Sequence, residues 1–348
     1  MKVLHITGTD YRLPNSLNAF QLQMYVHLIN WKWKHITKEV GYAKHRGQSI
    51  PYDAILPERM AEELRMIYPP VRERLRQHHV RNPFRKHNFF NHMVSSQAAN
   101  VNLFLPLLYH PEADHILRQL KPDFASLATD HLDHGYCLEF WGGNFDESVP
   151  RTGPLGDKHG SHGTDSDIAI AYRNHSGELC LWLIEHKLCE DGFTPCSGPE
   201  SEDRNRARHD CASSFADIVQ NKSTCFHHDF KRRNYWDITE RNRDVFPNHA
   251  GFAQCPFQGG LNQLWRNLLL ALALEQNESQ PYVHAYFSVV KHPANPHLQD
   301  SLASFKTLIA DNPKFSVFTS EDVLRTAGMI QDQEVKKWTQ WYRNLYLP

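Results

Sequence analysis

The stretch His162 to Glu190, HGTDSDIAIAYRNHSGELCLWLIEHKLCE, contains two short apolar runs joined by a polar turn. Successive side chains of a β-strand alternate between its two faces. In the first run, Asp167 therefore shares its face with two alanines, whereas the isoleucines and the tyrosine point to the opposite face. The small alanine side chains leave room around the carboxylate of Asp167.

The residues after this first run predict a hairpin. Asn174-His175-Ser176-Gly177 has the composition of a hairpin turn, and residues 179–188 then predict a second strand. In that strand Glu185 and Lys187 share one face, while His186 lies on the other. Two carboxylates and an ammonium group can therefore converge across neighbouring strands.

Length and composition predict a soluble globular protein. A chain of 348 residues can bury a large core, as one large domain or two ordinary ones. The net charge of −1 argues against a broad polybasic surface, so any nucleic-acid contact would need a local basic patch. The first residues, MKVLHITGTDYRLPN, have no apolar segment of the secretory type, and the apolar stretch 268–274 is too short to span a bilayer. We therefore expect a cytoplasmic protein that does not bind membranes.

Residues 1–90 predict a helical N-terminal region, with helical patterns over 16–40, 57–66 and 72–86. In the first pattern, Trp31-Lys32-Trp33-Lys34-His35 interleaves aromatic and basic residues. We favour an amphipathic helix that buries its tryptophans over a nucleic-acid contact made by stacking. The basic run 72–86 is the best local candidate for phosphate contact, and a solvated helix face is an equally good interpretation. Its cationic residues are Arg72, Arg74, Arg76, Arg81, Arg85 and Lys86.

Residues 91–348 predict a single α/β domain with a mixed central sheet flanked by helices. Strands are expected at 135–141, 282–291 and 315–318 besides the opening hairpin, and helices at 95–120, 263–276, 298–310 and 320–327. The termini are expected to decorate this core. The polar segment at about 190–255 is too long for a simple loop, which favours an inserted lobe that carries cysteines.

This order of elements and its charged residues resemble the PD-(D/E)XK nuclease superfamily, which has the restriction-endonuclease-like fold. The resemblance rests on Asp167, on Glu185-x-Lys187 and on Gln263-x-x-Arg266, which share a helix face. It covers about Ser95 to Val290, and SSQAANVNLF, LIEHKLCE and NQLWRNLLLALALE are similar to a bacterial branch of the superfamily. Ser166 stands where the first motif of that superfamily has a proline.

The resemblance implies a Mg²⁺ (or Mn²⁺) site, because hard divalent cations held by carboxylates neutralise the charge that develops on a phosphodiester during hydrolysis. Asp167 and Glu185 would be metal ligands, with the main-chain carbonyl of His186 as a third oxygen. Lys187 would orient or activate the attacking water. Glu139, one strand upstream, is a candidate for a further ligand.

The helix residues Gln263 and Arg266 would contact the phosphate, Arg266 by a forked contact. A salt-bridged cluster at a sheet end is the alternative interpretation of Asp167, Glu185 and Lys187. A polar cap on a helix face is the alternative for Gln263 and Arg266. His186 is expected to pack away from the site.

The cysteines support two interpretations. Seven is an odd number, and reduced thiols are the default in a cytosolic chain of this size. Cys196, Cys211, Cys225 and Cys255 fall in or next to the inserted lobe and would suit a structural Zn²⁺ ion or an iron-sulfur cluster. Since no spacing is C-x-x-C, independent buried thiols are the competing interpretation.

The sequence therefore predicts a Mg²⁺-dependent nuclease that hydrolyses phosphodiester bonds in nucleic acid, with DNA favoured. The alternative is a nucleic-acid-binding or scaffold protein on the same fold without catalysis. Because the chain is nearly neutral, a homodimer or a protein partner would supply part of the DNA surface.

Overall fold

The computed structural model describes residues 1–45, 47–86, 90–143, 153–157, 163–199 and 211–348. Its centre is a six-stranded mixed sheet in the order β10-β9-β8-β7-β5, with β6 paired to the same edge of β7 as β5. β8 runs parallel to β9, and β9 runs parallel to β10, while β7 is antiparallel to its partners. The strands are β5 (Phe124–Leu127), β6 (Tyr136–Phe140), β7 (Ser166–Asn174), β8 (Leu179–Lys187), β9 (His284–Lys291) and β10 (Phe315–Thr319).

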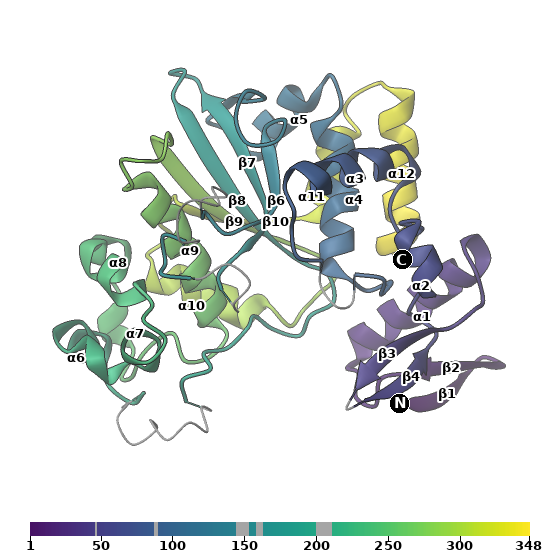
Figure 1. Cartoon of the computed structure of the whole chain (residues 1–348), viewed down its shortest axis with the longest axis horizontal. Coiled ribbons are helices and arrows are strands. Elements are labelled where there is room, and N and C mark those ends of the chain that lie inside the picture. The colour runs from purple at the N-terminus through teal and green to yellow at the C-terminus, as the bar shows by residue number, and fades with distance from the viewer. Residues whose placement is uncertain (46, 87–89, 144–152, 158–162, 200–210) are drawn as a thin grey trace.

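Helices cover both faces of this sheet (Figure 1). On one face, Ile168, Ile170 and Ile184 pack in the same core as α4 (Ser96–Leu108). On the other face, the alanines of β7 and the odd-numbered leucines of β8 pack in the core that contains α9 (Leu261–Glu275) and α10 (Gln299–Leu308). The predicted alternation of faces and the predicted mixed α/β sheet are therefore confirmed.

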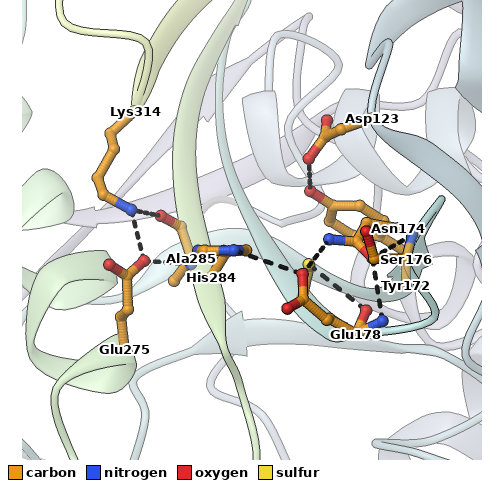
Figure 2. A network of polar contacts seen from close by, with 10 residues as sticks. Asp123, Tyr172, Asn174, Ser176, Glu178, Glu275, His284, Ala285 and Lys314 are labelled. Carbon is orange, nitrogen blue, oxygen red and sulfur yellow. Dashed lines mark hydrogen bonds and ion pairs between the residues drawn. The ribbon is translucent and has the colours of Figure 1, made fainter.

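The turn end of the β7–β8 hairpin is fixed by polar contacts (Figure 2). The side chain of Asn174 accepts hydrogen bonds from the backbone amides of Ser176 and Glu178, each at 3.0 Å. Tyr172 donates to Asp123 at 2.6 Å, and Glu178 lies 3.6 Å from the imidazole of His284. These contacts fix the register of neighbouring strands at one end, so the residues at the opposite end of β7 and β8 are held in place as well.

The N-terminal region is not purely helical, which corrects the prediction for residues 1–90. It contains two antiparallel hairpins as well as helices. Short strands with turn glycines were missed because the helical spacing of the next segment dominated the pattern. The elements are β1 (Lys2–Ile6), β2 (Thr9–Leu13), α1 (Ala19–His35), β3 (Gly41–His45), β4 (Gln48–Tyr52), α2 (Glu58–Glu62) and α3 (Arg72–Arg81).

The tryptophans of the aromatic and basic motif of α1 pack against other aromatic residues, as the amphipathic interpretation predicted, whereas Lys34 and His35 are exposed. Trp33 stacks on Tyr11 with ring centroids 5.3 Å apart, and Trp31 meets Trp341 edge to face. Lys32 is fully buried and donates to the backbone carbonyls of Glu39 and Asp53. Burial lowers the pKa of Lys32 to about 8, and the neighbouring carboxylates of Asp53 and Glu39 oppose that shift.

The inserted lobe contains short helices and an aromatic cluster. Within it lie α6 (Phe215–Gln220), α7 (Phe226–Asp229) and α8 (Tyr235–Arg241), and part of the predicted insertion, residues 200–210, lies outside the described residues. Trp236 and Phe257 pack on Trp265 of α9, with ring centroids 5.3 Å and 4.0 Å apart. The few aromatic residues of this otherwise polar segment therefore gather on the helix that follows.

The C-terminal residues belong to the core and do not merely decorate it. α11 (Ser320–Ala327) and α12 (Gln333–Tyr346) pack beside α4 and α5 (Ala113–Leu120). Trp338 is 2% exposed and donates from its indole nitrogen to the carbonyl of Asn102 at 2.8 Å. α12 was not predicted from the sequence, because its apolar residues are spaced among many polar ones.

Replacing Trp338 with alanine should therefore lower the free energy of unfolding by about 3–5 kcal/mol, because it empties a buried site and leaves a carbonyl unpaired. Denaturant titration followed by circular dichroism measures this change. The matched control is Lys337→Ala, one residue earlier on the exposed side of α12, which should unfold at the parent's denaturant concentration. Equal midpoints for the two variants would contradict the placement of α12 in the core.

Candidate active site

Asp167 and Glu185 meet at the end of the β7–β8 hairpin that lies opposite the turn. Asp167 follows the first residue of β7, and Glu185 lies two residues before the end of β8. The Oδ2 atom of Asp167 accepts a hydrogen bond from the backbone amide of His186 at 2.6 Å. This bond fixes the Asp167 carboxylate against the backbone that joins Glu185 to His186, as the alternation in the sequence predicted.

Both oxygens of Glu185 are held by side chains of α9 and by Lys187. Gln263 donates to Oε1 at 2.7 Å, and Asn267, one turn further along the helix, donates to Oε2 at 3.0 Å. The ammonium group of Lys187 lies 3.0 Å from Oε1. Asn267 was not predicted from the sequence, although its spacing of four residues after Gln263 places it on the same helix face.

Glu139 joins the site in a strained backbone conformation. It lies in β6 between the paired residues Leu138–Ile168 and Phe140–Ser166, which sets it beside Asp167. Its φ angle is +49°, in the left-handed region that costs a non-glycine residue of the order of 1–3 kcal/mol. Gln97 from α4 forms a hydrogen bond with its carboxyl group. The prediction that Glu139 belongs near the site is supported by its position.

Asp165 is a fourth carboxylate, and it was not among the predicted site residues. It precedes β7 by one residue, and its side chain is exposed to the cleft. The neighbouring Thr164 donates its backbone amide to Asp157 at 2.7 Å, and Asp157 forms a buried ion pair with Arg233 at 2.6 Å. The signal in the sequence was the spacing Asp165-x-Asp167, which puts both carboxylates on one side of an extended chain.

The crowding of these carboxylates perturbs their protonation. Burial and then the neighbouring Asp167 and Asp165 raise the pKa of Glu139 well above its usual range. Burial and then Glu185 raise the pKa of Asp167 in the same way, against the opposing hydrogen bond from the His186 amide. Burial between the walls of the cleft is the main cause that raises the pKa of Asp165 to about 6, and the negative charge of Glu185 is the second cause. The side chain of Asp165 nevertheless reaches solvent. A divalent cation would remove this repulsion.

Lys187 is protonated in this environment. Burial lowers its pKa, but the carboxylates of Glu185, Glu190 and Asp167 more than offset burial, and its pKa rises to about 12. A protonated ammonium group can orient a water molecule and stabilise developing negative charge. The protonated form does not itself act as a general base.

The side chains of Arg266 and His186 are not among those that hold the Asp167 and Glu185 carboxylates. The guanidinium of Arg266 lies within electrostatic range of Asp165 and of the lobe residues Tyr235 and His227. Its Nε atom is buried and has no hydrogen-bond partner among the described residues. His186 is fully buried on the opposite face of β8, and burial lowers its pKa to about 3. The expectation that the His186 side chain packs away from the site agrees with this position.

A deep cleft of about 1200 Å³ opens over the carboxylates. One wall comes from the sheet and the start of the lobe, including Glu190, Asp191 and Phe193. The opposite wall comes from the N-terminal region, including Lys44, Tyr52 and Arg85. The site is therefore accessible to a large polar substrate rather than sealed.

The donor set suits a hard divalent cation. Asp167 and Glu185 supply carboxylate oxygens side by side, and the main chain at His186 passes next to both. Such oxygen ligands are those that Mg²⁺ prefers, usually with several waters. Among the described residues, no three His, Cys, Asp or Glu side chains form a ready-made metal-binding group, which is compatible with a site of two carboxylates and one carbonyl.

The four cysteines of the lobe lie near one another. The sulfurs of Cys196 and Cys211 lie 3.3 Å and 3.4 Å from the position that a Cβ atom at Gly198 would take, and the Gly198 amide donates to the Cys196 sulfur. Cys225 and Cys255 lie within electrostatic range of Cys196. Among the described residues these cysteines are not arranged as a group that could hold a metal ion, so the structural metal stays a prediction.

The structure combines a mixed sheet with a carboxylate pair that suits a metal ion, a lysine two residues after the second carboxylate, and a polar helix face. This combination is that of the restriction-endonuclease-like class of proteins. The sequence also matches, over residues 29–347, the family described as Restriction Endonuclease associating with ARP, and the chain belongs to that family. The match crosses residue 90, so the predicted boundary between two regions stays a prediction.

No curated protein and no solved structure matches the chain. Among the residues that the structure describes, there is no helix with the length and apolar character needed to cross a membrane.

The raised carboxyl pKa values predict a pH-dependent effect of Mg²⁺ on stability. A carboxyl group with a raised pKa in the folded state stabilises the fold below its unfolded pKa, and that contribution is lost as pH rises through the folded pKa. For Asp165 this window runs from 3.8 to about 6. The pKa of Asp167, a proposed ligand, is raised as well, so Mg²⁺ competes with protons for its oxygens. Mg²⁺ should therefore raise the Tm by a few degrees more at about pH 8 than at about pH 5.5.

Thermal melts with and without Mg²⁺ at both pH values measure this difference. Asp167→Asn, which removes a charge and a ligand without changing shape, should abolish most of the Mg²⁺ effect. An equal Tm increase at both pH values in the parent protein would contradict this prediction.

Proposed function

We propose that this protein is a Mg²⁺-dependent nuclease that hydrolyses phosphodiester bonds in nucleic acid, with DNA as the favoured substrate. The observation that carries the proposal is the contact of Asp167 with the backbone at Glu185 and His186, together with Lys187 beside the Glu185 carboxylate. The membership of a restriction-endonuclease family supports a nuclease-like activity.

In the proposed mechanism, Asp167, Glu185 and the main-chain carbonyl of His186 would hold the metal ion. When bound, the ion supplies Lewis acidity for the phosphate oxygens and acidifies a water molecule. Lys187 would orient a water molecule in line with phosphorus and stabilise charge on the non-bridging oxygens. A bond forms between the water oxygen and phosphorus as the bond to the leaving oxygen breaks. The attacking water gives up a proton to solvent, and the leaving oxygen takes up a proton from solvent to become a hydroxyl group.

The helix α9 positions these groups. Gln263 and Asn267 hold Glu185 by its two oxygens, so the carboxylate keeps one orientation for the metal. Arg266, beside Asp165, would contact the substrate phosphate after a change in its side-chain rotamer. Glu139 and Asp165 add negative charge that increases the attraction for a divalent cation.

Removing the carboxylate of Asp167 should abolish cleavage, and removing the ammonium group of Lys187 should slow it strongly. Asp167→Ala should leave no cleavage above background, and Lys187→Ala should lower the rate by about 10²–10⁴-fold. The measurement is cleavage of linear, circular and single-stranded substrates with Mg²⁺ or Mn²⁺, and with EDTA as the metal-free arm. The control is Lys34→Ala, an exposed lysine outside the cleft, which should cleave at the parental rate.

If the Asp167 and Lys187 variants cut as fast as the parent, this site is not the nuclease centre. If the parent binds nucleic acid in Mg²⁺ but forms no product, the chain is a non-catalytic binding or scaffold protein on the same fold.

We also propose that Cys196, Cys211, Cys225 and Cys255 bind one structural metal, zinc or iron. Their proximity and the Gly198 amide bond to Cys196 support the proposal. Elemental analysis of the purified parent should find about one zinc, or iron with sulfide, per chain, and Cys225→Ser should lose it. The control Cys180→Ser, a buried cysteine of β8, should retain the metal. A metal-free parent would end the proposal.

The family description names an association with ARP. We propose that a protein partner supplies part of the nucleic-acid surface, since the chain itself has a net charge of −1.

A further inference from the structure

The two walls of the cleft carry opposite charge. The wall formed by the sheet and the start of the lobe, here called the acidic wall, contains six carboxylates. They are Glu139, Asp165, Asp167, Glu185, Glu190 and Asp191. Of the described residues that line the cleft, three carry cationic side chains, and one of these, Lys187, is paired with Glu185. The other two, Lys44 and Arg85, lie on the N-terminal wall.

This asymmetry restricts where a polyanion can be held. A metal ion would neutralise the acidic wall only around the scissile phosphate, and the neighbouring phosphates would still face carboxylates. Phosphate contacts are made mainly by arginine, lysine and backbone amides. Lys44 and Arg85 are exposed, and neither side chain forms an ion pair with any described residue, so both are available for such contacts.

Arg85 is linked to the catalytic carboxylates by a short chain of hydrogen bonds. Its backbone carbonyl accepts from the Nε2 atom of Gln97 at 3.0 Å, and Gln97 also bonds to the carboxyl group of Glu139. The backbone of Arg85 is thus held near Glu139, and its side chain lines the cleft. Of the arginines in the basic run, Arg85 lines the cleft. Arg81 is bonded instead to Asp133, and Arg72 to backbone carbonyls.

The N-terminal wall is rigidly attached to the core. Backbone bonds join Leu56 to Asn91 at 3.0 Å and Met93 to Ala54 at 2.8 Å, and Gln21 donates to the carbonyl of Cys189 just after β8. Gly41 of the β3–β4 hairpin packs so closely that an added Cβ would overlap Ile55. A wall fixed in this way can hold a substrate at a constant distance from the carboxylates.

We infer that the N-terminal wall is a phosphate-binding surface for the same substrate, and that Arg85 and Lys44 contact backbone phosphates that flank the scissile one. The inference rests on the proposed nuclease function. It makes the N-terminal region part of substrate binding rather than a decoration of the nuclease core.

The test is nucleic-acid binding by the full chain in the Lys187→Ala background, in which the proposed mechanism predicts strongly slowed cleavage in Mg²⁺. Fluorescence anisotropy with a labelled duplex and a labelled single strand gives the dissociation constant over a series of salt concentrations. Adding Arg85→Glu and Lys44→Glu together should raise the dissociation constant at least about tenfold. It should also lower the slope of log K against log salt by about 1 for each phosphate that the protein no longer neutralises.

The matched control is Lys38→Glu, an exposed lysine of the same region that does not line the cleft, which should bind with the parental salt slope. Circular dichroism melts verify that every variant is folded. If the double variant keeps the parental affinity and slope, the N-terminal wall does not bind phosphate, although cleavage by the parent would still support the nuclease. If the parent neither binds nor cuts nucleic acid, both the proposed function and this inference fail.

Discussion

The like-charge repulsion among Glu139, Asp165, Asp167 and Glu185 is the constraint on which the rest of the structure depends. Burial and then neighbouring carboxylates raise the pKa of Glu139, Asp165 and Asp167, and a fold gains no stability from such a cluster unless something neutralises it. Lys187 supplies one positive charge at 3.0 Å from Glu185. In the proposed function, a divalent cation would neutralise the remaining negative charge.

The elements around this cluster hold it in one geometry. The polar contacts at the turn end fix the register of β7 and β8, and the hydrogen bonds from α9 fix both oxygens of Glu185. The lobe supports the cluster from another side, because its Arg233 is paired with Asp157, whose carboxylate fixes the loop before Asp165. A loss of any of these supports would change the spacing of the carboxylates before it changed the overall fold.

Much of the central fold could be predicted from the sequence because period-two alternation and helical spacing are local signals. Ile168 and Ala169 already separate the two faces of β7, and the helix that carries Gln263 is strongly apolar. Asp167, Glu185 and Lys187 were predictable as neighbours because they lie on one hairpin. The structure places Gln263 on Glu185 as well, whereas Arg266 lies near Asp165 and the lobe.

The remaining features depend on contacts between distant segments, which a single sequence does not reveal. Asn267 and Asp165 gain their roles only when α9 and the loop before β7 fold against β8. The role of Arg85 in the cleft depends on Gln97, twelve residues later, and on how the N-terminal hairpins pack. The positive φ of Glu139 has no signature in the residues beside it.

The central claim is that Asp167, Glu185 and the carbonyl of His186 hold one divalent cation. Its most direct test is anomalous X-ray diffraction from crystals grown with Mn²⁺. The expected result is one strong anomalous peak, with those three oxygens as ligands at about 2.1 Å. Ordered carboxylates with no peak between them, or a Mn²⁺ ion bound elsewhere without Asp167 and Glu185, would contradict it.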